Sequence, residues 1–477
     1  MPKLHQPRHS VPWPLLLAAI LTAGTAFSAT VRIDDDRMLV VDGKRRFVVG
    51  LYENPKDDTV LRQVADAGFN LVRSAASRSA LDRLERHGLH GWVNTGSAID
   101  LSKQQETRTA QLKQLVDRTG NHPAMLLWEV PDEALWNCWY RAFQWQHGQE
   151  PTQQLQQIKA LSDHQQSEKL KQMHAEARSH LEVADYVTYE RIADQIWRDL
   201  GSAQPHPELR LSTAPERAAK MSDGMLKGYT LLNRLDASHP IWMNHAPRNS
   251  IAQLARFDRA ADIVGCDIYP VPPYVGGHSD LTDRSLSAVG QYTRRMQEAA
   301  PEKPVFMVLQ GFGWTDIGQK KDNPAAGRRP TFRETRFMAY DAIVRGSRGI
   351  LYWGTHSIEK DSSLWSDLLK LSRELTDLKD VLAARDVVPP LKIELAAETW
   401  GSLDRGVLVL GKAHNGHTWL IVVNEWNEPL RYRIAGLPDS GKQPYINVHT
   451  KAAVPVDSGA LTGTIRGQGV QVLAPVP

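Results

Sequence analysis

Cysteine is scarce in this chain, which has only Cys138 and Cys266 among its 477 residues. Two cysteines leave one bridge open but cannot supply the disulfide framework of a small secreted domain. The net charge is small as well, since the chain has 57 lysines and arginines and 54 aspartates and glutamates. A nearly neutral balance lacks the basic footprint that nucleic acid or anionic lipid requires. We therefore expect neither a disulfide-built fold nor a nucleic-acid partner.

The usual motifs for metals and cofactors are missing too. His245 and His356 are isolated, and the sequence contains neither an HExxH motif nor a paired-cysteine spacing. Its glycines never form a phosphate-binding loop that opens a helix, and it lacks the GxSxG motif of an esterase. We expect no metal and no cofactor.

Long apolar runs are confined to the N-terminus. Lys3 and Arg8 precede an apolar run over 15–27. The small residues Ala26 and Ser28 then provide a plausible cleavage site. The run falls short of the roughly 20 residues of a membrane span, and this order of features is typical of a signal peptide. We expect residues 1–28 to be removed, which would leave a periplasmic or secreted protein without a membrane span.

From residue 47 onward, short apolar runs alternate with amphipathic helical stretches. The strand-like runs lie at 47–54, 69–76, 89–96, 124–130, 240–246, 262–270, 304–314 and 349–356. Eight βα units in succession predict an α/β fold, a (β/α)8 TIM barrel over 47–385. The active face of such a barrel lies at the C-terminal ends of its strands.

The regular spacing is broken once, between the fourth and fifth strands. The residues there are rich in Gln, Lys and Glu, and they predict a helical insertion at about 134–213 before a barrel helix near 214–236. An insertion at this point would sit over the active face. Trp136, Trp139 and Trp145 are then either platforms for sugar rings or the core of a helical cap.

Two smaller segments flank the barrel. Residues 29–46 are typical of an N-terminal β-hairpin at the bottom of the barrel. Short alternating strands over 386–477, after the prolines at 389–390, predict a C-terminal β-sandwich.

Two stretches place a carboxylate beside an amide or a second carboxylate, next to tryptophan. Asn427 and Glu428, in WNEP, fall in a turn of the predicted sandwich, where Asn, Glu and Pro are ordinary turn residues. Asp132 and Glu133, in WEVPDEALW, fall at the C-terminal end of the fourth barrel strand. Because this fold places its reactive groups there, the second stretch is the candidate for catalysis.

The chain resembles the retaining (β/α)8 glycoside hydrolases of clan A. In that family the fourth strand ends in tryptophan, three residues and Asn-Glu, with the glutamate as general acid/base, and Trp128, Asp132 and Glu133 have this spacing. Further matches at strand ends are Arg73 in GFNLVR, Asp267 and Tyr269 in DIYP, and Trp353 in YWG. The resemblance spans residue 47 to about 385 and implies cleavage of an oligo- or polysaccharide.

Two positions depart from the family. Asp132 replaces the asparagine before the acid/base, and Gln310 occupies the place of the nucleophilic glutamate at the end of the seventh strand. An amide cannot form the glycosyl ester of a retaining mechanism. Either another second group is used, or the chain is a non-catalytic carbohydrate-binding or polysaccharide-assembly protein on the same barrel.

The sequence leaves the second catalytic group open. Glu133 can be the general acid, because burial and its neighbour Asp132 would raise its pKa. Asp267 or Glu53 could activate water in an inverting reaction. Alternatively, the substrate's own 2-acetamido group attacks while Asp132 orients it, which resembles substrate-assisted N-acetylhexosaminidases. Asp132 could also simply cap the following helix.

Other side chains at strand ends are candidates for binding the sugar. They are Glu53, Arg73, Trp92, Asn244, Tyr269, Gln310 and Trp353. The rings of Tyr269 and Trp353 could instead be barrel packing. Arg73, if buried, needs a carboxylate partner, which Glu129 or Asp132 could supply.

Overall fold

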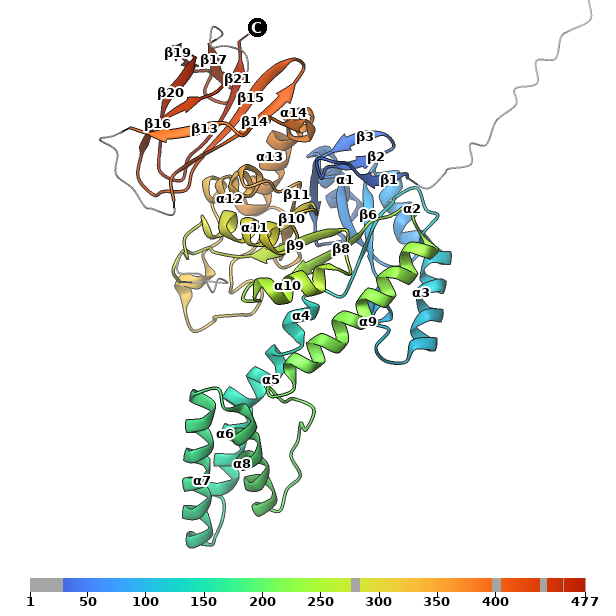
Figure 1. Ribbon diagram of the computed structural model, residues 1–477, viewed down its shortest axis with the longest axis vertical. Coiled ribbons are helices and arrows are strands. Elements are labelled where there is room, and N and C mark those ends of the chain that lie inside the picture. The colour runs from blue at the N-terminus through green and yellow to red at the C-terminus, as the bar shows by residue number, and fades with distance from the viewer. Residues whose placement is uncertain (1–28, 276–283, 397–404, 438–443, 458, 477) are drawn as a thin grey trace, which may run out of the picture.

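A closed barrel of eight parallel strands forms the centre of the molecule (Figure 1). The computed structural model describes residues 29–275, 284–396, 405–437, 444–457 and 459–476. The barrel strands are β4 (Val48–Leu51), β5 (Leu71–Ser74), β6 (His90–Asn94), β7 (Met125–Glu129), β8 (Ile241–His245), β9 (Ile263–Ile268), β10 (Val305–Gln310) and β11 (Gly349–Trp353). The predicted α/β class and the (β/α)8 barrel are confirmed.

The strands are mostly apolar because both of their faces are largely buried, and most of their polar residues lie near the C-terminal ends. Helices cover the outside of the barrel: α1 (Asp58–Asp66), α2 (Arg78–Arg86), α3 (Gln105–Thr119), α9 (Ala214–Leu235), α10 (Ile251–Asp258), α11 (Ala288–Ala299), α12 (Phe332–Val344) and α13 (Ser363–Asp377). Side-chain caps fix where several of them begin, for example Asp57 before α1 and Thr331 in a capping box before α12. The helix predicted near 214–236 is α9.

The barrel interior is filled by large rings. Trp92 on β6 and Trp242 on β8 lie edge to face with their centroids 5.5 Å apart. Tyr52, directly after β4, packs on both rings at 5.1 and 5.4 Å. The interior is therefore a packed core that forms the floor beneath the mouth of the barrel.

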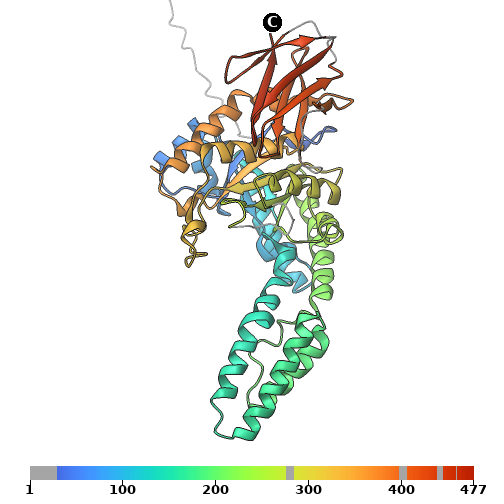
Figure 2. The same ribbon diagram turned by 90° about the vertical axis from the view of Figure 1, so that its left-hand side faces the viewer.

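The insertion after β7 forms a helical arm that projects from the barrel (Figures 1 and 2). Its helices are α4 (Ala134–Asn137), α5 (Tyr140–Gln144), a π-helical turn Trp145–Gln149, α6 (Glu150–Lys159), α7 (His164–Glu182) and α8 (Tyr186–Asp199). Helices α6 to α8 pack around a separate small core that includes Leu170, Tyr189 and Ile196. The insertion is confirmed as helical, but most of it extends away from the barrel.

Small β-structures flank the barrel at both chain ends. An antiparallel sheet of β1 (Val31–Ile33), β2 (Leu39–Val41) and β3 (Lys44–Arg46) adds a third strand to the predicted hairpin. The C-terminal sandwich pairs a six-stranded with a four-stranded sheet after α14 (Lys379–Ala383). Its strands are β12 (Arg385–Asp386), β13 (Lys392–Leu395), β14 (Val407–His414), β15 (His417–Asn424), β16 (Leu430–Ala435), β17 (Tyr445–Asn447), β18 (Ala453–Val454), β19 (Val456–Asp457), β20 (Ala460–Ile465) and β21 (Val470–Pro475).

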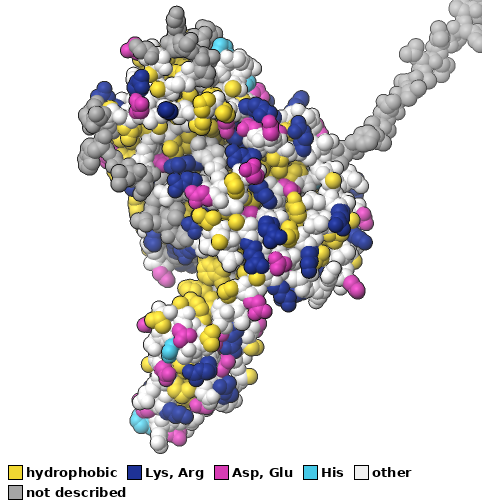
Figure 3. All heavy atoms as spheres, viewed as in Figure 1, with side chains coloured by type: hydrophobic (Ala, Val, Ile, Leu, Met, Phe, Trp, Pro, Cys, Tyr) yellow, Lys and Arg dark blue, Asp and Glu magenta, His cyan; other side chains and the backbone are white. Residues whose placement is uncertain are grey.

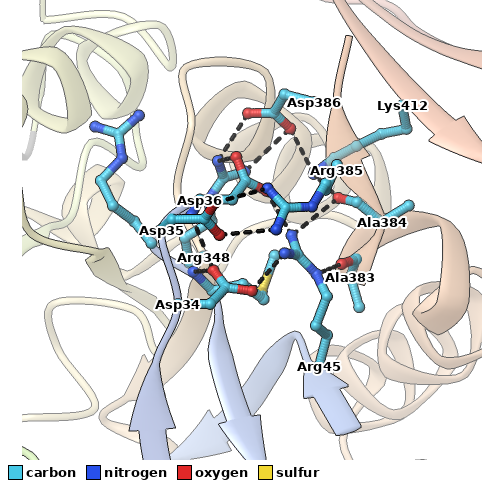
Figure 4. Close-up of polar contacts among 12 residues, drawn as sticks. Asp34, Asp35, Asp36, Arg45, Arg348, Ala383, Ala384, Arg385, Asp386 and Lys412 are labelled. Carbon is cyan, nitrogen blue, oxygen red and sulfur yellow. Dashed lines mark hydrogen bonds and ion pairs between the residues drawn. The ribbon is translucent and has the colours of Figure 1, made fainter.

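An ion-pair network joins these flanking units to the barrel at the N-terminal ends of its strands (Figure 4). Arg348, 3% exposed and directly before β11, lies 2.7 Å from Asp386 and 3.4 Å from Asp36. Lys412 of β14 approaches the same Asp386 to 2.7 Å. Arg45 of β3 pairs with Asp36 as well. One network therefore ties the N-terminal sheet, the barrel and the sandwich together, far from the active face.

The structure also bears on the two cysteines and on membrane-spanning helices. Cys138 and Cys266 are buried free thiols, so the bridge that the sequence left open is not formed. Within the described ranges, no helix combines the length and the apolar character that crossing a membrane requires.

Candidate active site

A cleft of about 490 Å³ opens at the C-terminal mouth of the barrel. Asp132 and Glu133 reach it from the end of β7, Asn244 from β8 and Asp267 from β9. All four were predicted as site residues from their places at strand ends. The closed barrel brings them together because the C-terminal ends of parallel strands converge on one rim.

The chain turns sharply where the two catalytic candidates lie. Glu133 has a left-handed backbone with φ 50, directly before helix α4. Its N–H donates to the carbonyl of Asn244 at 3.2 Å, and the Asn244 amide donates to Asp132 Oδ1 at 3.0 Å. A left-handed glutamate is a strained conformation that costs on the order of 1 kcal/mol, and such strain is concentrated at functional sites. No capping bond from Asp132 to α4 is formed within the described segment.

Glu133 is an acid with an unusually high proton affinity. Burial raises its pKa to about 7, and the negative charge of Asp132 adds to the shift. A hydrogen bond between the Glu133 and Asp267 carboxyls partly opposes it. A carboxyl with this pKa is still largely protonated at the start of the neutral range, which suits a general acid.

The neighbouring carboxyls are shifted in the same direction. Burial, followed by the charges of Glu133 and Asp132, raises the pKa of Asp267 well above its ordinary value. Asp132 is more open to the cleft, but the surrounding protein still raises its pKa, while Asn244 and the charge of Arg73 oppose this. The cluster therefore retains protons at a pH where ordinary carboxyls have lost them.

A fourth carboxyl, which the sequence indicated only as a possible partner of Arg73, lies beneath the cleft. Glu129, the last residue of β7, is fully buried, and burial and the charge of Asp132 raise its pKa to about 7. It accepts hydrogen bonds from the Tyr52 hydroxyl at 2.8 Å and from the Asn94 amide at 2.6 Å. An acidic residue inside an otherwise apolar strand was the signal that could have identified it, because buried carboxyls require such partners.

Two groups of aromatic rings line the cleft. Tyr269 and Trp353 stack with centroids 5.6 Å apart and an interplanar angle of 19°, and Trp314 lies beside Tyr269. The second group is Trp136 and Tyr140 of the insertion, which stack at 4.4 Å and 26°. All five rings line the cleft. Flat rings facing a polar cleft are the surfaces on which pyranose rings stack.

The three tryptophans of the insertion that were candidates for sugar binding lie in different environments. Trp136 lines the cleft, and Trp139 packs against it with centroids 4.2 Å apart. Trp145 is buried and lies against His206 at the base of the arm. The insertion thus reaches the cleft through Trp136 and Tyr140, and the expectation that it covers the active face holds only for its beginning.

Two predicted binding residues line neither the cleft nor the hollow beside it. Trp92 is fully buried in the barrel interior. Gln310 is also fully buried, and its amide accepts from the N–H of Val271 at 2.8 Å. The same amide donates to the carbonyls of Val271 and Phe312 at 2.8 and 3.0 Å. Gln310 therefore fixes the backbone after β9 and β10, and a carboxylate could not replace its two donated bonds.

Glu53 and Arg73 line an adjoining hollow that shares Tyr52 and Trp353 with the cleft. Glu53 accepts from the Thr355 hydroxyl and from the Lys360 ammonium, both at 2.7 Å. Arg73 is exposed, and it forms no ion pair with any residue in the described part of the chain. Its charge nevertheless acts on both carboxyls expected as its partners, because it opposes the upward pKa shifts of Glu129 and Asp132.

One group of side chains outside the cleft has the spacing of a metal site. Asp82, Glu85 and His122 could place ligand atoms within 4.8 Å of one another. His122 Nδ1, however, accepts the N–H of Ala124 at 3.1 Å, so its other ring nitrogen carries the proton that contacts Asp82 at 2.9 Å. These hydrogen bonds occupy both ring nitrogens of His122, so we do not assign a metal site to the three residues.

Comparison with solved structures supports the architecture. No protein family and no curated protein matches this chain by sequence. A structure described as a glycoside hydrolase aligns at 12% identity over 94% of this chain and 96% of that chain, with a TM-score of 0.52. A glycoside hydrolase family 5 structure from Bacteroides vulgatus aligns at 12% identity over 94% and 92%, with a TM-score of 0.53. A beta-galactosidase from Bacillus circulans sp. alkalophilus aligns at 10% identity over 90% and 99%, with a TM-score of 0.51. At such low identity these likenesses show a shared fold.

Proposed function

We propose that this protein is an exported glycoside hydrolase that cleaves O-glycosidic bonds of an oligo- or polysaccharide, with Glu133 as the general acid. The observation that carries the proposal is Glu133 itself, a carboxyl with a pKa of about 7 at the mouth of the barrel. It lies in a cleft walled by stacked aromatic rings. The fold shared with solved glycoside hydrolases is consistent with this chemistry.

The reaction needs a proton on the leaving oxygen as the glycosidic bond breaks. Glu133 supplies that proton because burial and the adjacent Asp132 charge keep it protonated up to about pH 7. The Asp267 hydrogen bond orients the Glu133 carboxyl within the cleft. Stacking on rings such as Trp136 and Trp353 would hold the sugar beside it.

The contacts distinguish among the candidates for the second group. Glu53 forms an ion pair with Lys360 at 2.7 Å and lines the adjoining hollow rather than the cleft. Asp267 is hydrogen-bonded to Glu133, whereas an inverting pair keeps its carboxyls roughly 6.5–9.5 Å apart to hold a water. Asp132 opens into the cleft and is steadied by Asn244. These contacts favour attack by the substrate's 2-acetamido group, with Asp132 orienting it.

Export rests on the N-terminal sequence. A basic start, an apolar run over 15–27 and small residues up to position 28 support removal of a signal peptide. The proposed location is the periplasm or the extracellular space. N-terminal sequencing of the protein recovered from cells and medium tests this part, since an N-terminus upstream of the apolar run would contradict it.

A product screen tests the hydrolase proposal. The purified protein is incubated with a panel of polysaccharides and N-acetylated oligosaccharides, and the products are separated by size. Glu133→Gln should lower the rate by at least about 10²-fold, because the variant cannot donate the proton. Glu428→Gln, in an exposed turn of the sandwich, is the matched control and should keep full activity. Binding without turnover by the unaltered protein would instead favour a carbohydrate-binding protein.

A further inference from the structure

Two unpaired arginines flank the carboxyl cluster, and from them we infer that the substrate is an anionic carbohydrate, carrying carboxylate or sulfate groups that Arg248 and Arg73 bind. The carbohydrate nature of this substrate rests on the function proposed above. Its negative charge is argued separately, from the basic groups that line the cleft and the adjoining hollow.

Arg248 is placed on one wall of the cleft by the turn after β8. It lines the cleft, its side chain is exposed, and it makes no hydrogen bond or ion pair with any residue that the structure describes. Its backbone is left-handed, with φ 70, and so is that of Lys320, with φ 52, which lines the same cleft. Such strain is retained where the position of a side chain matters more than local stability.

Arg248 and Lys320 lie close enough to repel each other. Burial lowers the pKa of Lys320, and the positive charge of Arg248 lowers it further. The Lys320 ammonium also lies 4.2 Å from the centre of the Trp314 ring. An anion bound by Arg248 would therefore also lie near a second positive charge.

Arg73 provides the second cationic position. The hollow that it lines adjoins the cleft at Tyr52 and Trp353, and Lys56 and His356 line it as well. Arg73 and Lys56 are exposed and, among the described residues, have no ion-pair partner. A chain that crosses the carboxyl cluster from cleft to hollow would therefore meet a free guanidinium on each side.

The lack of partners is selective, because other basic groups around this mouth are paired. Lys360 binds Glu53 at 2.7 Å, and Arg329 binds Asp316 at 2.8 Å and Glu359 at 2.7 Å. A guanidinium left free offers a planar fork of donors that matches a carboxylate or a sulfate in two parallel hydrogen bonds.

The carboxyl cluster between the arginines does not oppose this inference. Glu133 and Glu129 each have a pKa of about 7, and the pKa of Asp267 is raised as well. Protonated carboxyls carry no charge, so the centre of the cleft repels an anionic chain less than four ordinary carboxylates would.

Equilibrium binding of matched glycan pairs tests the inference. The pairs are hyaluronan and chitin oligosaccharides, pectate and its methyl ester, and dextran sulfate and dextran. The first two pairs probe carboxylate and the third probes sulfate. Titration calorimetry of the full chain at low salt should show one charged member bound at least about tenfold more tightly than its neutral partner, and the difference should shrink as salt is added.

Variants assign the charge to the proposed residues. Arg248→Gln and Arg73→Gln should each weaken binding of the charged glycan about tenfold or more, while leaving the neutral partner unaffected. Arg32→Gln is the matched control, since Arg32 is an exposed arginine on β1 at the opposite end of the barrel. Melting temperatures near that of the unaltered protein confirm that the variants are folded.

The outcomes separate this inference from the hydrolase proposal. Equal binding within every pair, no charged glycan bound below the millimolar range, or no effect of the two substitutions would each overturn the inference. Turnover restricted to neutral glycans would also overturn it and leave the hydrolase proposal intact. Charge-selective binding that requires both arginines, without turnover, would support the inference and contradict hydrolysis.

Discussion

Glu133 and Asp267 share a hydrogen bond between their carboxyl groups, although they come from barrel strands separated by β8. Two carboxylates repel each other, so this bond forms only when one of them holds a proton. Tyr269 also hydrogen-bonds Asp267 and restrains its side chain. The barrel therefore builds a proton-holding pair at the point where the proposed reaction needs an acid.

Activity should fall as the pH rises through about 7. Glu133 has a pKa of about 7, and only its protonated form can act as the acid. Asp132→Asn removes the negative charge that contributes to this shift, so the alkaline decline should move to lower pH. The pH dependence of kcat/KM measures both effects. A decline in the Asp132→Asn variant at the same or higher pH would contradict the electrostatic account of Glu133.

The ion-pair network at the other end of the barrel should govern stability. Asp386→Asn leaves the buried Arg348 and Lys412 without their shared anion, which should cost about 3 kcal/mol. Asp35→Asn is the control, because Asp35 pairs with Arg385 in solvent and should contribute almost nothing. Urea titration at neutral pH compares the two variants. Equal midpoints would show that the network contributes little.

The same network predicts sensitivity to acid. The ion pairs with Arg348 and Lys412 lower the pKa of Asp386 to about 2, from an ordinary 3.8. A lowered folded-state pKa adds stability above the unfolded value, and this part is lost as the pH falls from about 4 toward 2. The difference in stability between the unaltered protein and Asp386→Asn should shrink over this interval.

Much of the fold could be predicted because buried parallel strands produce short apolar runs that are easy to recognise in a sequence. The barrel strands are mostly apolar and buried, and several helices between them begin at side-chain caps such as Asp57 and Ser77. Six predicted site residues meet in the cleft because they follow directly from strand ends: Asp132, Glu133, Asn244, Asp267, Tyr269 and Trp353. Because all barrel strands end at the same rim, a correct prediction of the strands also predicts that these side chains lie together.

The rest of the site depends on contacts that cannot be predicted from the spacing of apolar residues in the sequence. Arg248, Trp314 and Lys320 lie on connecting segments, whose paths do not follow from a strand or helix pattern. Trp92 and Gln310 belong to strands as predicted, but their side chains point into packed interior. Whether a strand-end residue faces the cleft or lies under it is decided by strand tilt and by the loops above.

Gln310→Glu should destabilise the protein rather than restore a covalent mechanism. The substituted carboxylate would be fully buried, and it could not donate to the carbonyls of Val271 and Phe312. Losing these bonds should cost on the order of 2 kcal/mol. Gln319→Glu, on an exposed residue at the cleft rim, should leave the melting temperature nearly unchanged. A trapped covalent glycosyl intermediate in Gln310→Glu would contradict this reading of the position.

Removing helices α6 to α8, the outer part of the arm, should leave a folded barrel with an intact cleft. The amide of Gln146 donates to the carbonyl of Leu209 at 3.3 Å, so a short Gly-Ser joint can replace residues 147–208. Trp145 is changed to serine in the same variant, because its ring loses the cover of His206. Helices α6 to α8 have their own core. The shortened chain should therefore unfold cooperatively and keep its glycan affinity.

None of the described residues of α6 to α8 lines the cleft, and a matched variant separates the outer arm from the part of the insertion that does. Figure 3 shows apolar side chains gathered where the arm leaves the barrel, and Phe143 of α5 is 40% exposed. Trp136→Ala changes the cleft and keeps helices α6 to α8, so it should weaken glycan binding about tenfold. Lost affinity in the shortened chain with unchanged affinity in Trp136→Ala would reverse this assignment.

The configuration of the first-formed product decides how the glycosidic bond is broken. Attack by the substrate's acetamido group, with Asp132 as the orienting residue, gives a cyclic intermediate that water opens, so the anomeric configuration is retained. Proton NMR of early product should show the retained anomer, and substrates without an N-acetyl group should not be cleaved. A thiazoline mimic of the cyclic intermediate should inhibit strongly, because it resembles the transition state. Asp132→Asn should lower kcat by about 10²-fold with little change in KM, since Asp132 acts on the attacking group rather than on sugar binding. An inverted product would contradict this route and would indicate that Asp267 separates from Glu133 on binding to activate water.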